Sequence, residues 1–274
     1  MKYTLLILSL VVSNLLVLAQ PEDHPKHEKH YADIEPIETE QLRIEVRRPH
    51  SQMNFSEITL RIFNKTDDFI IIKKHEWTFT SQENGYGKQH PVESTVFIEP
   101  KGDITRPFKV LGGVGVKVNN LEVIPGGIIQ APAKGEPVET VDFKFKPEKN
   151  SMMIGPFAVT VKKWRFNSKE LSADFKIRYR GDAVGLVDES KIKIRTESGE
   201  VLYNTRAKEK PFVLVPMKTR TATAVRSFDK GLVGKGESVY VVWEEALMEA
   251  EGIPLEVPTM KFTYDSEKTK KENK

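Results

Sequence analysis

Residues 63–74 read FNKTDDFIIIKK, and this stretch decides the fold class. Its centre is a polar turn, because Asn, Thr and Asp side chains form local hydrogen bonds with the backbone that favour turns. An apolar run follows at residues 69–72, and before the turn Ile58, Leu60 and Ile62 alternate with polar neighbours. Alternation with a period of two residues is typical of half-buried strands. The stretch therefore predicts a strand, a turn and a second strand.

The same alternation recurs on both sides of a linker predicted at residues 147–156. Apolar residues alternate with polar ones at Leu42, Ile44 and Val46; at Val141, Phe143 and Phe145; at Phe157, Val159 and Val161; at Phe175, Ile177 and Tyr179; at Val239, Val241 and Trp243; and at Met260, Phe262 and Tyr264. Only residues 243–252 have a helical composition, and a strand end followed by a loop explains them equally well. Short strands without crossover helices are typical of antiparallel sandwiches.

The two halves of the chain align with an offset of about 116 residues, which places Phe63 on Tyr179 and Pro100 on Pro216. This alignment indicates a structural repeat of about 110 residues, close to the usual size of a domain. We predict an all-β protein with two tandem immunoglobulin-like antiparallel β-sandwich domains, at residues 41–148 and 149–264. Residues 20–40 are predicted as a flexible linker, and residues 265–274 as a disordered charged tail.

The first 19 residues have the pattern of an export signal. Lys2 precedes an apolar run, and the small residues Val17 and Ala19 fit a cleavage site before Gln20. The alternative is an uncleaved membrane anchor, but the run is short for a span, which needs about 20 residues. No later segment is apolar enough to cross a bilayer. We therefore predict a periplasmic or secreted protein without a stable membrane span.

Composition excludes several classes of protein. The 274 residues include no cysteine, so disulfides are impossible although the export route would allow them. The 42 basic and 39 acidic residues give a net charge of +3, which is too balanced for charge-driven binding of nucleic acid. Residues 151–264 contain no histidine or cysteine, which removes Ser-His-Asp and Cys-His catalysis from the second domain.

The first domain also resembles a known family. The segments EVRRPHSQMNFSEITLRIFNKTDDFIIIKKHEWTF (residues 45–79) and HPVESTVFIEPKGDITRPFKV (residues 90–110) resemble the amino-terminal sandwich of PapD-like periplasmic pilus chaperones. The shared pattern is a basic first strand, a strand that ends in Asn and a polar turn, a strand with Trp, and a strand that closes on Pro and Gly. The resemblance covers residues 42–146, and the family's Pro-x-x-Arg-Glu-Ser segment is absent.

The resemblance implies a binding site for a partner protein. In that family, a basic residue on the first strand and another on the last strand of the first domain face the inter-domain cleft and hold a subunit's carboxyl terminus. Arg47 lies at the first position, and Lys144 or Lys146 at the second. The alternative is that all three simply occupy the solvent face of their strands, as alternation alone predicts.

Half of the six histidines lie in HPKHEKH, residues 24–30. His24, His27 and His30, spaced by three residues, could bind Zn, Cu or Ni on one side of a helix. Pro21 and Pro25 oppose a helix, however, and nothing in the sequence fixes the rings. We predict a solvated segment without metal, whose histidines do not contribute to thermal stability.

The tryptophans complete the set of candidate residues. Trp77 and Trp243 are predicted to fill the cores, whereas Trp164 lies in KKWRF beside three basic residues and could stack on a partner side chain or a sugar. We predict a non-enzymatic, cofactor-free, exported binding or assembly protein that recognises a protein partner through a sheet edge or the inter-domain cleft. The alternatives are a glycan-binding module or glycan-acting enzyme, and a metal-binding exported protein.

Overall fold

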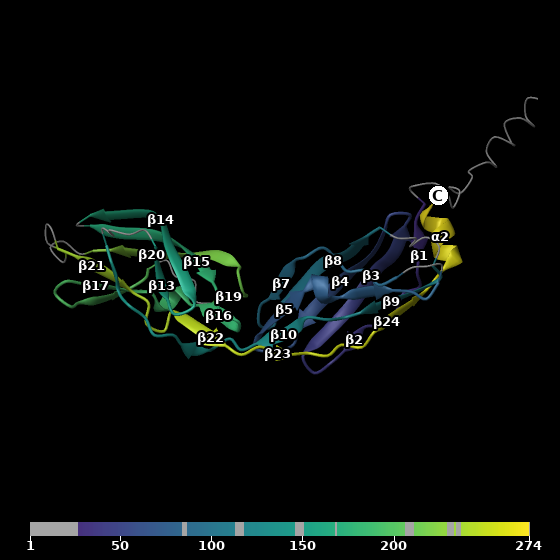
Figure 1. Cartoon of the computed structure of the whole chain (residues 1–274), viewed down its shortest axis with the longest axis horizontal. Coiled ribbons are helices and arrows are strands. Elements are labelled where there is room, and N and C mark those ends of the chain that lie inside the picture. The colour runs from purple at the N-terminus through teal and green to yellow at the C-terminus, as the bar shows by residue number, and fades with distance from the viewer. Residues whose placement is uncertain are drawn as a thin grey trace, which may run out of the picture. The chain divides into compact units, whose positions relative to one another are not determined.

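The computed structural model describes residues 27–83, 87–112, 118–145, 151–167, 169–205, 211–228, 233 and 237–273. The predicted export signal lies outside the described residues. The protein is all-β and sandwich-like, with antiparallel sheets in two compact units (Figure 1). Unit 1 contains Met1–Thr66, Ile70–Ile129 and Pro254–Lys274, and unit 2 contains Asp67–Phe69 and Gln130–Ile253. Among the described residues, no helix has the length and apolar composition needed to cross a membrane.

Three antiparallel sheets contain the strands of unit 1. The first has β1 (Lys29–His30), β3 (Leu42–Gln52), β4 (Phe55–Asn64) and β8 (Asp103–Leu111) in that order, with β2 (Ile37–Glu38) also on β3. The second has β24 (Met260–Thr263), β9 (Asn120–Ile124) and β6 (Thr78–Thr80). The third, mostly of unit 1, has β23 (Ile253–Pro254), β10 (Ile128–Ala131), β5 (Phe69–Lys73) and β7 (Thr95–Ile98).

Unit 2 is built in the same way. Its first sheet has β13 (Ser151–Ile154), β14 (Phe157–Asn167), β15 (Glu170–Tyr179) and β20 (Thr219–Ser227). Its second has β12 (Phe143–Lys144), β21 (Val239–Val242), β17 (Lys193–Thr196) and β18 (Val201–Tyr203). Its third has β11 (Glu136–Pro137), β22 (Leu247–Ala250), β16 (Val184–Val187) and β19 (Phe212–Leu214). Short helices are η1 (Lys74–Glu76), η3 (Glu189–Lys191) and α2 (Ser266–Glu272).

The two units share one pattern of strand pairing. The β3–β4 hairpin ends with Gln52 opposite Phe55, and the β14–β15 hairpin ends with Asn167 opposite Glu170, so equivalent positions here are 115 residues apart. Each first strand has a register shift shortly before this end, after Arg47 in β3 and after Val161 in β14. The pairing of β9 with β24 in unit 1 also corresponds to the pairing of β21 with β12 in unit 2.

The strands that close each unit come from outside its predicted domain. The segments GEPVETVDFKF (135–145) and GIPLEVPTMKF (252–262) align without a gap and share Gly, Pro, Glu, Lys and Phe. The first supplies β11 and β12 to unit 2, and the second supplies β23 and β24, of which β24 joins unit 1. The observed units therefore differ from the predicted ranges 41–148 and 149–264. Period-two alternation identifies a strand and its buried face but not its partner.

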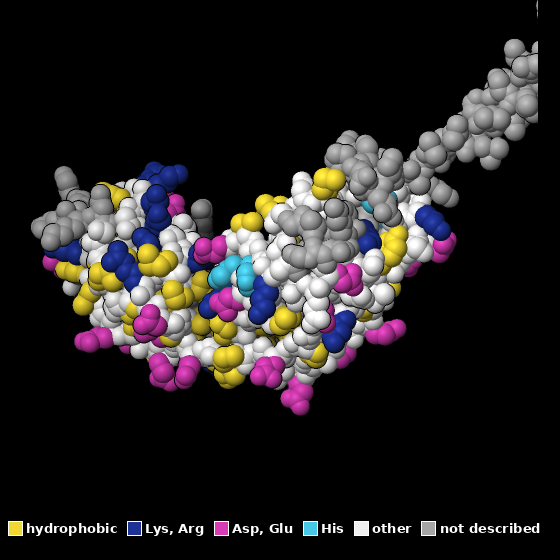
Figure 2. All heavy atoms as spheres, turned by 45° about the vertical axis from the view of Figure 1, so that its right-hand side comes forward, with side chains coloured by type: hydrophobic (Ala, Val, Ile, Leu, Met, Phe, Trp, Pro, Cys, Tyr) yellow, Lys and Arg dark blue, Asp and Glu magenta, His cyan; other side chains and the backbone are white. Residues whose placement is uncertain are grey.

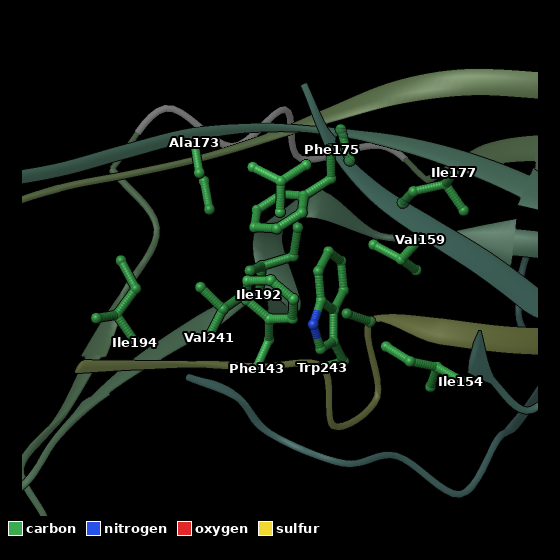
Figure 3. Close-up of a cluster of buried hydrophobic side chains, with 14 of the residues drawn as sticks. Phe143, Ile154, Val159, Ala173, Phe175, Ile177, Ile192, Ile194, Val241 and Trp243 are labelled. Carbon is green, nitrogen blue, oxygen red and sulfur yellow. The ribbon is translucent and has the colours of Figure 1, made fainter. Parts of the chain in front are cut away.

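Alternating apolar residues form a separate core in each unit. Trp77 packs against Phe108 in unit 1, and Trp243 packs against Phe175 in unit 2, with ring centroids 4.5 and 4.9 Å apart. Both tryptophans are completely buried, which confirms the prediction that they are core residues. Figure 3 shows Trp243 surrounded by Phe143, Phe175 and aliphatic side chains. Val141 is an exception to the predicted pattern, because it is 59% exposed.

Both ends of the described chain are ordered, contrary to the predicted linker and tail. Residues 29–30 and 37–38 form strands on β3, although residues 20–26 lie outside the described part. At the other end, residues 266–272 form α2, whose N-terminus is capped by Asp265 accepting a hydrogen bond from Lys268 N–H at 2.9 Å. Composition alone missed this order, because these short elements depend on contacts with distant residues.

Candidate functional site

Among the described residues, the second half of β14 has a free edge. β15 pairs with β14 as far as Asn167, but β13 covers only Phe157–Thr160 on the other side. In the part of the chain that the structure describes, no strand pairs with that side of residues 163–167. A register shift between Val161 and Lys163 separates the covered half from the free half. A free strand edge presents N–H and C=O groups that another strand can bind.

The equivalent edge in unit 1 is covered by the chain itself. Counted from the end of each hairpin, His50 of β3 is equivalent to Arg165 of β14. β1 occupies this edge of unit 1 and places His30 opposite His50. The pairing continues with a hydrogen bond of 3.1 Å from the Tyr31 N–H to the Pro49 carbonyl. As far as the structure describes the chain, the two units therefore differ in whether this edge already has a strand.

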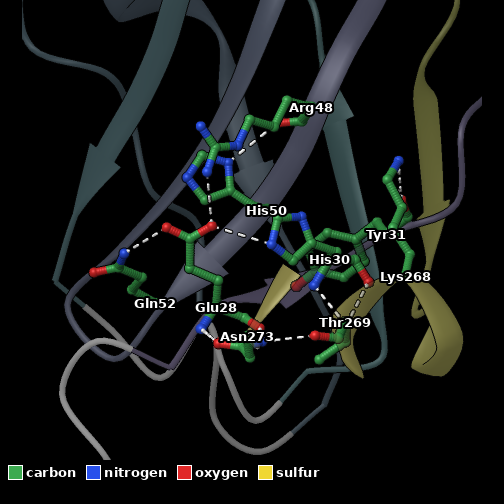
Figure 4. A network of polar contacts seen from close by, with 9 residues as sticks. All are labelled: Glu28, His30, Tyr31, Arg48, His50, Gln52, Lys268, Thr269 and Asn273. Carbon is green, nitrogen blue, oxygen red and sulfur yellow. Dashed lines mark hydrogen bonds and ion pairs between the residues drawn. The ribbon is translucent and has the colours of Figure 1, made fainter. Parts of the chain in front are cut away.

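A polar network holds the covering strand in unit 1 (Figure 4). The Glu28 carboxylate accepts hydrogen bonds of 3.0 Å from both Arg48 and Gln52 on β3. It also lies 3.0 Å from Nε2 of His30, at ion-pair distance but outside hydrogen-bond geometry. The His30 ring stacks on His50 with 5.8 Å between centroids. The outward side of β1 thus matches the polar residues of the β3 edge.

The C-terminal helix α2 packs against the same strand. The Thr269 hydroxyl accepts a hydrogen bond from the His30 N–H at 2.9 Å. The Asn273 amide donates to the Glu28 carbonyl at 2.6 Å and accepts from the Glu28 N–H at 2.9 Å. These bonds satisfy backbone groups of β1 that its pairing with β3 leaves free. The two ends of unit 1 are therefore joined on its outer edge.

Side chains at the free edge of β14 alternate between two environments. Trp164 and Phe166 lie opposite the buried residues Ala173 and Leu171, so they share the core-facing side of the sheet. Phe145 contacts both, with ring centroids 6.0 Å from Trp164 and 6.4 Å from Phe166. Trp164 is nevertheless 45% exposed. The apolar side of this edge is therefore only partly covered.

The other side of the same sheet carries four cations that we call the basic face. They lie on the neighbouring strands β14 and β15, and their side chains point away from the core, as do those of the residues opposite them. The four are Lys163, Arg165, Lys176 and Arg178. Within the described residues, none of the four forms an ion pair; Arg178 instead donates a 3.5 Å hydrogen bond to the sulfur of Met217. Figure 2 shows Lys and Arg side chains, in dark blue, gathered near the top of the unit at the left.

The corresponding surface of unit 1 is neutralised by its own carboxylates. Four cations of its first sheet, on strands β3, β4 and β8, each have an acidic partner. The ion pairs are Arg43–Glu38 at 3.4 Å, Arg43–Glu45 at 3.0 Å, Arg47–Glu45 at 3.4 Å, Arg61–Asp103 at 2.9 Å and Lys109–Glu57 at 3.8 Å. The unpaired charge is therefore a property of unit 2 and not of the shared fold.

The residues proposed to anchor a carboxyl terminus are not parts of one domain. Arg47 belongs to β3 of unit 1 and pairs with Glu45. Lys144 belongs to β12 of unit 2, where it lies opposite Tyr240 of β21. Lys146 lies outside the described residues. The last strand of unit 1 is instead β24, so the resemblance placed Lys144 on the wrong strand for that role.

The predicted metal ligands are not assembled into a site. His24 lies outside the described residues, and the described chain contains no group of three or more His, Cys, Asp or Glu side chains placed to hold a metal. His27 and His30 are buried rather than solvated. Burial lowers the pKa of His30, and the nearby His50 and Arg48 act in the same direction, while Glu28 and Glu272 oppose them. Because His30 is buried, we expect its replacement to affect stability, in contrast to the prediction made from the sequence.

Sequence reasoning identified Trp164 and its basic neighbours but not the free edge. Lys163 and Arg165 flank Trp164 in the sequence, and alternation alone would have placed them on the opposite face. Whether a strand edge is free depends on which other strand occupies it, and this information lies far away in the chain. The signal available was the short apolar run before Pro156, because a short β13 cannot cover a long β14.

Comparisons with known proteins do not assign a family. A scan against protein-family models and a search of curated proteins both give no match. Similar solved structures include the seed globulin procruciferin of Brassica napus, with 8% identity, 89% of this chain and 86% of that chain covered, and a TM-score of 0.18. A tandem CBM22 domain of Paenibacillus barcinonensis Xyn10C has 9% identity, coverages of 86% and 98%, and a TM-score of 0.15.

A third structure, AerE from Microcystis aeruginosa, has 8% identity, coverages of 78% and 99%, and a TM-score of 0.11. None of these three is a pilus chaperone. Structures with TM-scores this low share no function with this chain by virtue of the likeness.

Proposed function

We propose that this protein is an exported, non-enzymatic binding or assembly protein that holds a partner protein by strand addition at the free edge of β14. The observation that carries the proposal is the contrast at equivalent positions: β1 covers the edge in unit 1, and no described strand covers residues 163–167 in unit 2. Strand addition uses main-chain hydrogen bonds for affinity and alternate side chains for specificity.

The long outer strands elsewhere offer poorer edges. β20 is blocked by side chains, since Asn204 bonds Val225 N–H at 3.0 Å and Thr223 carbonyl at 2.8 Å, and Glu189 accepts from Thr223 N–H at 3.2 Å. β8 contains Pro107, which lacks an N–H group and is typical of protected edges. Among the described residues, the free half of β14 has neither a proline nor side chains bonded to its edge, which favours it as the docking position.

The sequence supports the remaining parts of the proposal. Residues 1–19 have the composition of an export signal. The shared strand pairing of both units is compatible with two immunoglobulin-like sandwiches related to PapD-like chaperones, which would place the protein in a periplasm or outside the cell. The absence of histidine and cysteine from residues 151–264 argues against nucleophilic catalysis in the unit that carries the free edge.

Site-selective photo-crosslinking tests this function. Because the chain has no cysteine, Asn167→Cys creates a single attachment point for a benzophenone at the free edge. Lys144→Cys, on a different sheet of unit 2, is the matched control. Incubated with the native envelope fraction, the Asn167 probe should label one extended segment of one protein, and the Lys144 probe should not.

Equal labelling from both positions would contradict the proposed site. Labelling of polysaccharide rather than protein at Asn167 would replace the proposal with glycan binding, for which the exposed Trp164 ring is a suitable stacking surface.

A further inference from the structure

The geometry of β14 constrains what kind of strand can bind there. Neighbouring residues on paired strands share one face of the sheet, with Cβ atoms about 4.5–5.5 Å apart. A strand added beside residues 163–167 therefore sends every second side chain toward Trp164 and Phe166. The intervening side chains point toward Lys163 and Arg165. One set of added side chains therefore meets aromatic rings, and the other set meets positive charges.

The core-facing side favours apolar residues. Trp164 is 45% exposed and Phe166 is partly buried, and both rings pack against Phe145 at the margin of the unit 2 core. Apolar side chains placed next to them would extend this core and remove aromatic surface from water. A charged side chain in the same position would lose hydration without gaining a partner.

The outward side favours carboxylates. Lys163 and Arg165 have no acidic partner among the described residues, and Lys176 and Arg178 extend the positive charge onto β15. One acidic residue lies among them: Asp174 is directly opposite Lys163 on β15, forms no ion pair with it, and accepts a hydrogen bond from the Thr223 hydroxyl at 2.9 Å. Because Arg binds carboxylates through two parallel hydrogen bonds, Arg165 is suited to an Asp or Glu on an added strand.

In unit 1 the equivalent edge is already paired with a strand of the same chain, and the residues of that strand can be compared with the inferred partner. The strand that covers the equivalent edge runs Glu28, Lys29, His30, Tyr31. Its acidic residue, Glu28, binds Arg48 and Gln52 at the outward side of the edge. Its aromatic residue, Tyr31, is completely buried in the core. In this strand an acidic residue, Glu28, faces outward and an aromatic residue, Tyr31, faces inward, while His30 and Lys29 occupy the other outward and inward positions.

We infer that the partner of unit 2 contributes an extended polypeptide segment in which acidic and apolar residues alternate, with the acidic residues facing Lys163 and Arg165 and the apolar residues facing Trp164 and Phe166. This inference rests on the proposed function, because it specifies the chemistry of the strand that the free edge of β14 binds. The occupant is a protein segment and not an anionic polysaccharide, since only a polypeptide supplies both the backbone pairing and the alternation.

Blocked synthetic peptides test this inference on the full mature chain. The first alternates Glu and Val over six residues between glycines. The second has the same composition in two blocks, Glu-Glu-Glu-Val-Val-Val, and the third replaces each Glu of the first with Lys. Affinities measured by calorimetry should rank the alternating acidic peptide first, by about tenfold over each of the others, because one charge-assisted pair is worth about that ratio.

Charge reversal at the edge provides the matched variants. The double variant Lys163→Glu/Arg165→Glu should lose about tenfold in affinity for the alternating acidic peptide and gain for the Lys peptide. Lys144→Glu, on another sheet of unit 2, has a charge reversal of the same kind and should leave the ranking unchanged. Circular dichroism spectra equal to the wild-type spectrum establish that the variants fold.

Amide hydrogen exchange separates this inference from the proposed function. A peptide that slows exchange at residues 163–167 binds at the edge whatever its charge. Edge protection with equal affinities for the Glu and Lys peptides would overturn the inferred chemistry and leave strand addition intact. Tight binding of the acidic peptide without protection of these amides, or full displacement by heparin and polyglutamate alike, would overturn the edge site itself.

Discussion

His30 of β1 lies directly opposite His50 of β3, and their rings stack with 5.8 Å between centroids and 16° between planes. This pair closes the outer edge of unit 1 at the position where unit 2 has Arg165. One pattern of strand pairing therefore occurs twice in the chain, and among the described residues an edge strand covers this position in unit 1 but not in unit 2. On this difference rests the proposal that unit 2 binds a partner and unit 1 does not.

The buried His30 predicts acid sensitivity of unit 1. Burial lowers its pKa below the ordinary value of 6.5, so the folded state favours the neutral ring. The contribution of this residue to stability is complete above pH 6.5, the unfolded value, and is lost as the pH falls toward the lower folded value. The melting temperature of the wild type should therefore decrease between about pH 8 and pH 5 by more than that of His30→Phe, which does not titrate.

Thermal melts of both proteins across that range provide the measurement. Parallel pH profiles of the wild type and His30→Phe would show that His30 is not the responsible group. The charged neighbours Glu28, Arg48, His50 and Glu272 are the same in both proteins.

The closing strands predict which unit a mutation destabilises. Phe262 of β24 is buried in the core of unit 1, although it follows all of unit 2 in the chain. Phe262→Ala should cost about 3–5 kcal/mol of unfolding free energy, as is usual for removing a buried aromatic ring, and should act on unit 1. Segment-resolved hydrogen exchange locates the effect.

Phe145→Ala is the matched variant for the aligned closing segment. Its ring belongs to the core of unit 2, so faster exchange should appear in residues 151–205 and not in residues 42–64. The reverse assignment, with Phe145→Ala loosening unit 1, would restore the contiguous domains predicted from the sequence.

The three tryptophans predict a graded series of stability changes. Trp77 and Trp243 are completely buried, and replacing either with Ala should cost about 3–5 kcal/mol through loss of contacts and cavity formation. Trp164 is 45% exposed, so Trp164→Ala should cost about 1 kcal/mol or less. Urea unfolding followed by circular dichroism measures all three. A large loss for Trp164→Ala would show that this ring is structural and not available to a partner.

The sequence predicted local structure well, because alternation reports directly on burial. Ile58, Leu60 and Ile62 are completely buried, as their spacing indicates. It did not predict that residues 27–31 are ordered, since His30 and Glu28 are polar and their order comes from contacts with β3 and α2 more than 15 residues away. Composition describes what a segment can bury alone, and these residues are held by others.

The sequence also did not reveal which strands pair with each other. Phe143 and Met260 both have the pattern of strand residues, yet nothing local distinguishes β21 from β9 as the neighbouring strand. The free edge of β14 was out of reach for the same reason, because an open edge is defined by which strand does not pair with it. The residues that give the edge its chemistry, Trp164 and Arg165, were visible in the sequence from the start.

Disulfide trapping tests the central claim most directly, because the chain has no cysteine of its own. Asn167→Cys keeps Lys163, Trp164 and Arg165 intact at the free edge, and Lys144→Cys is the control. An alternating Glu-Val peptide with one cysteine at an acidic position, activated as its 2-pyridyl disulfide, should exchange with the Asn167→Cys thiol and release pyridine-2-thione at least about tenfold faster than with the control, since pairing holds the two sulfurs in the required range. Equal rates at both positions would contradict strand addition at β14.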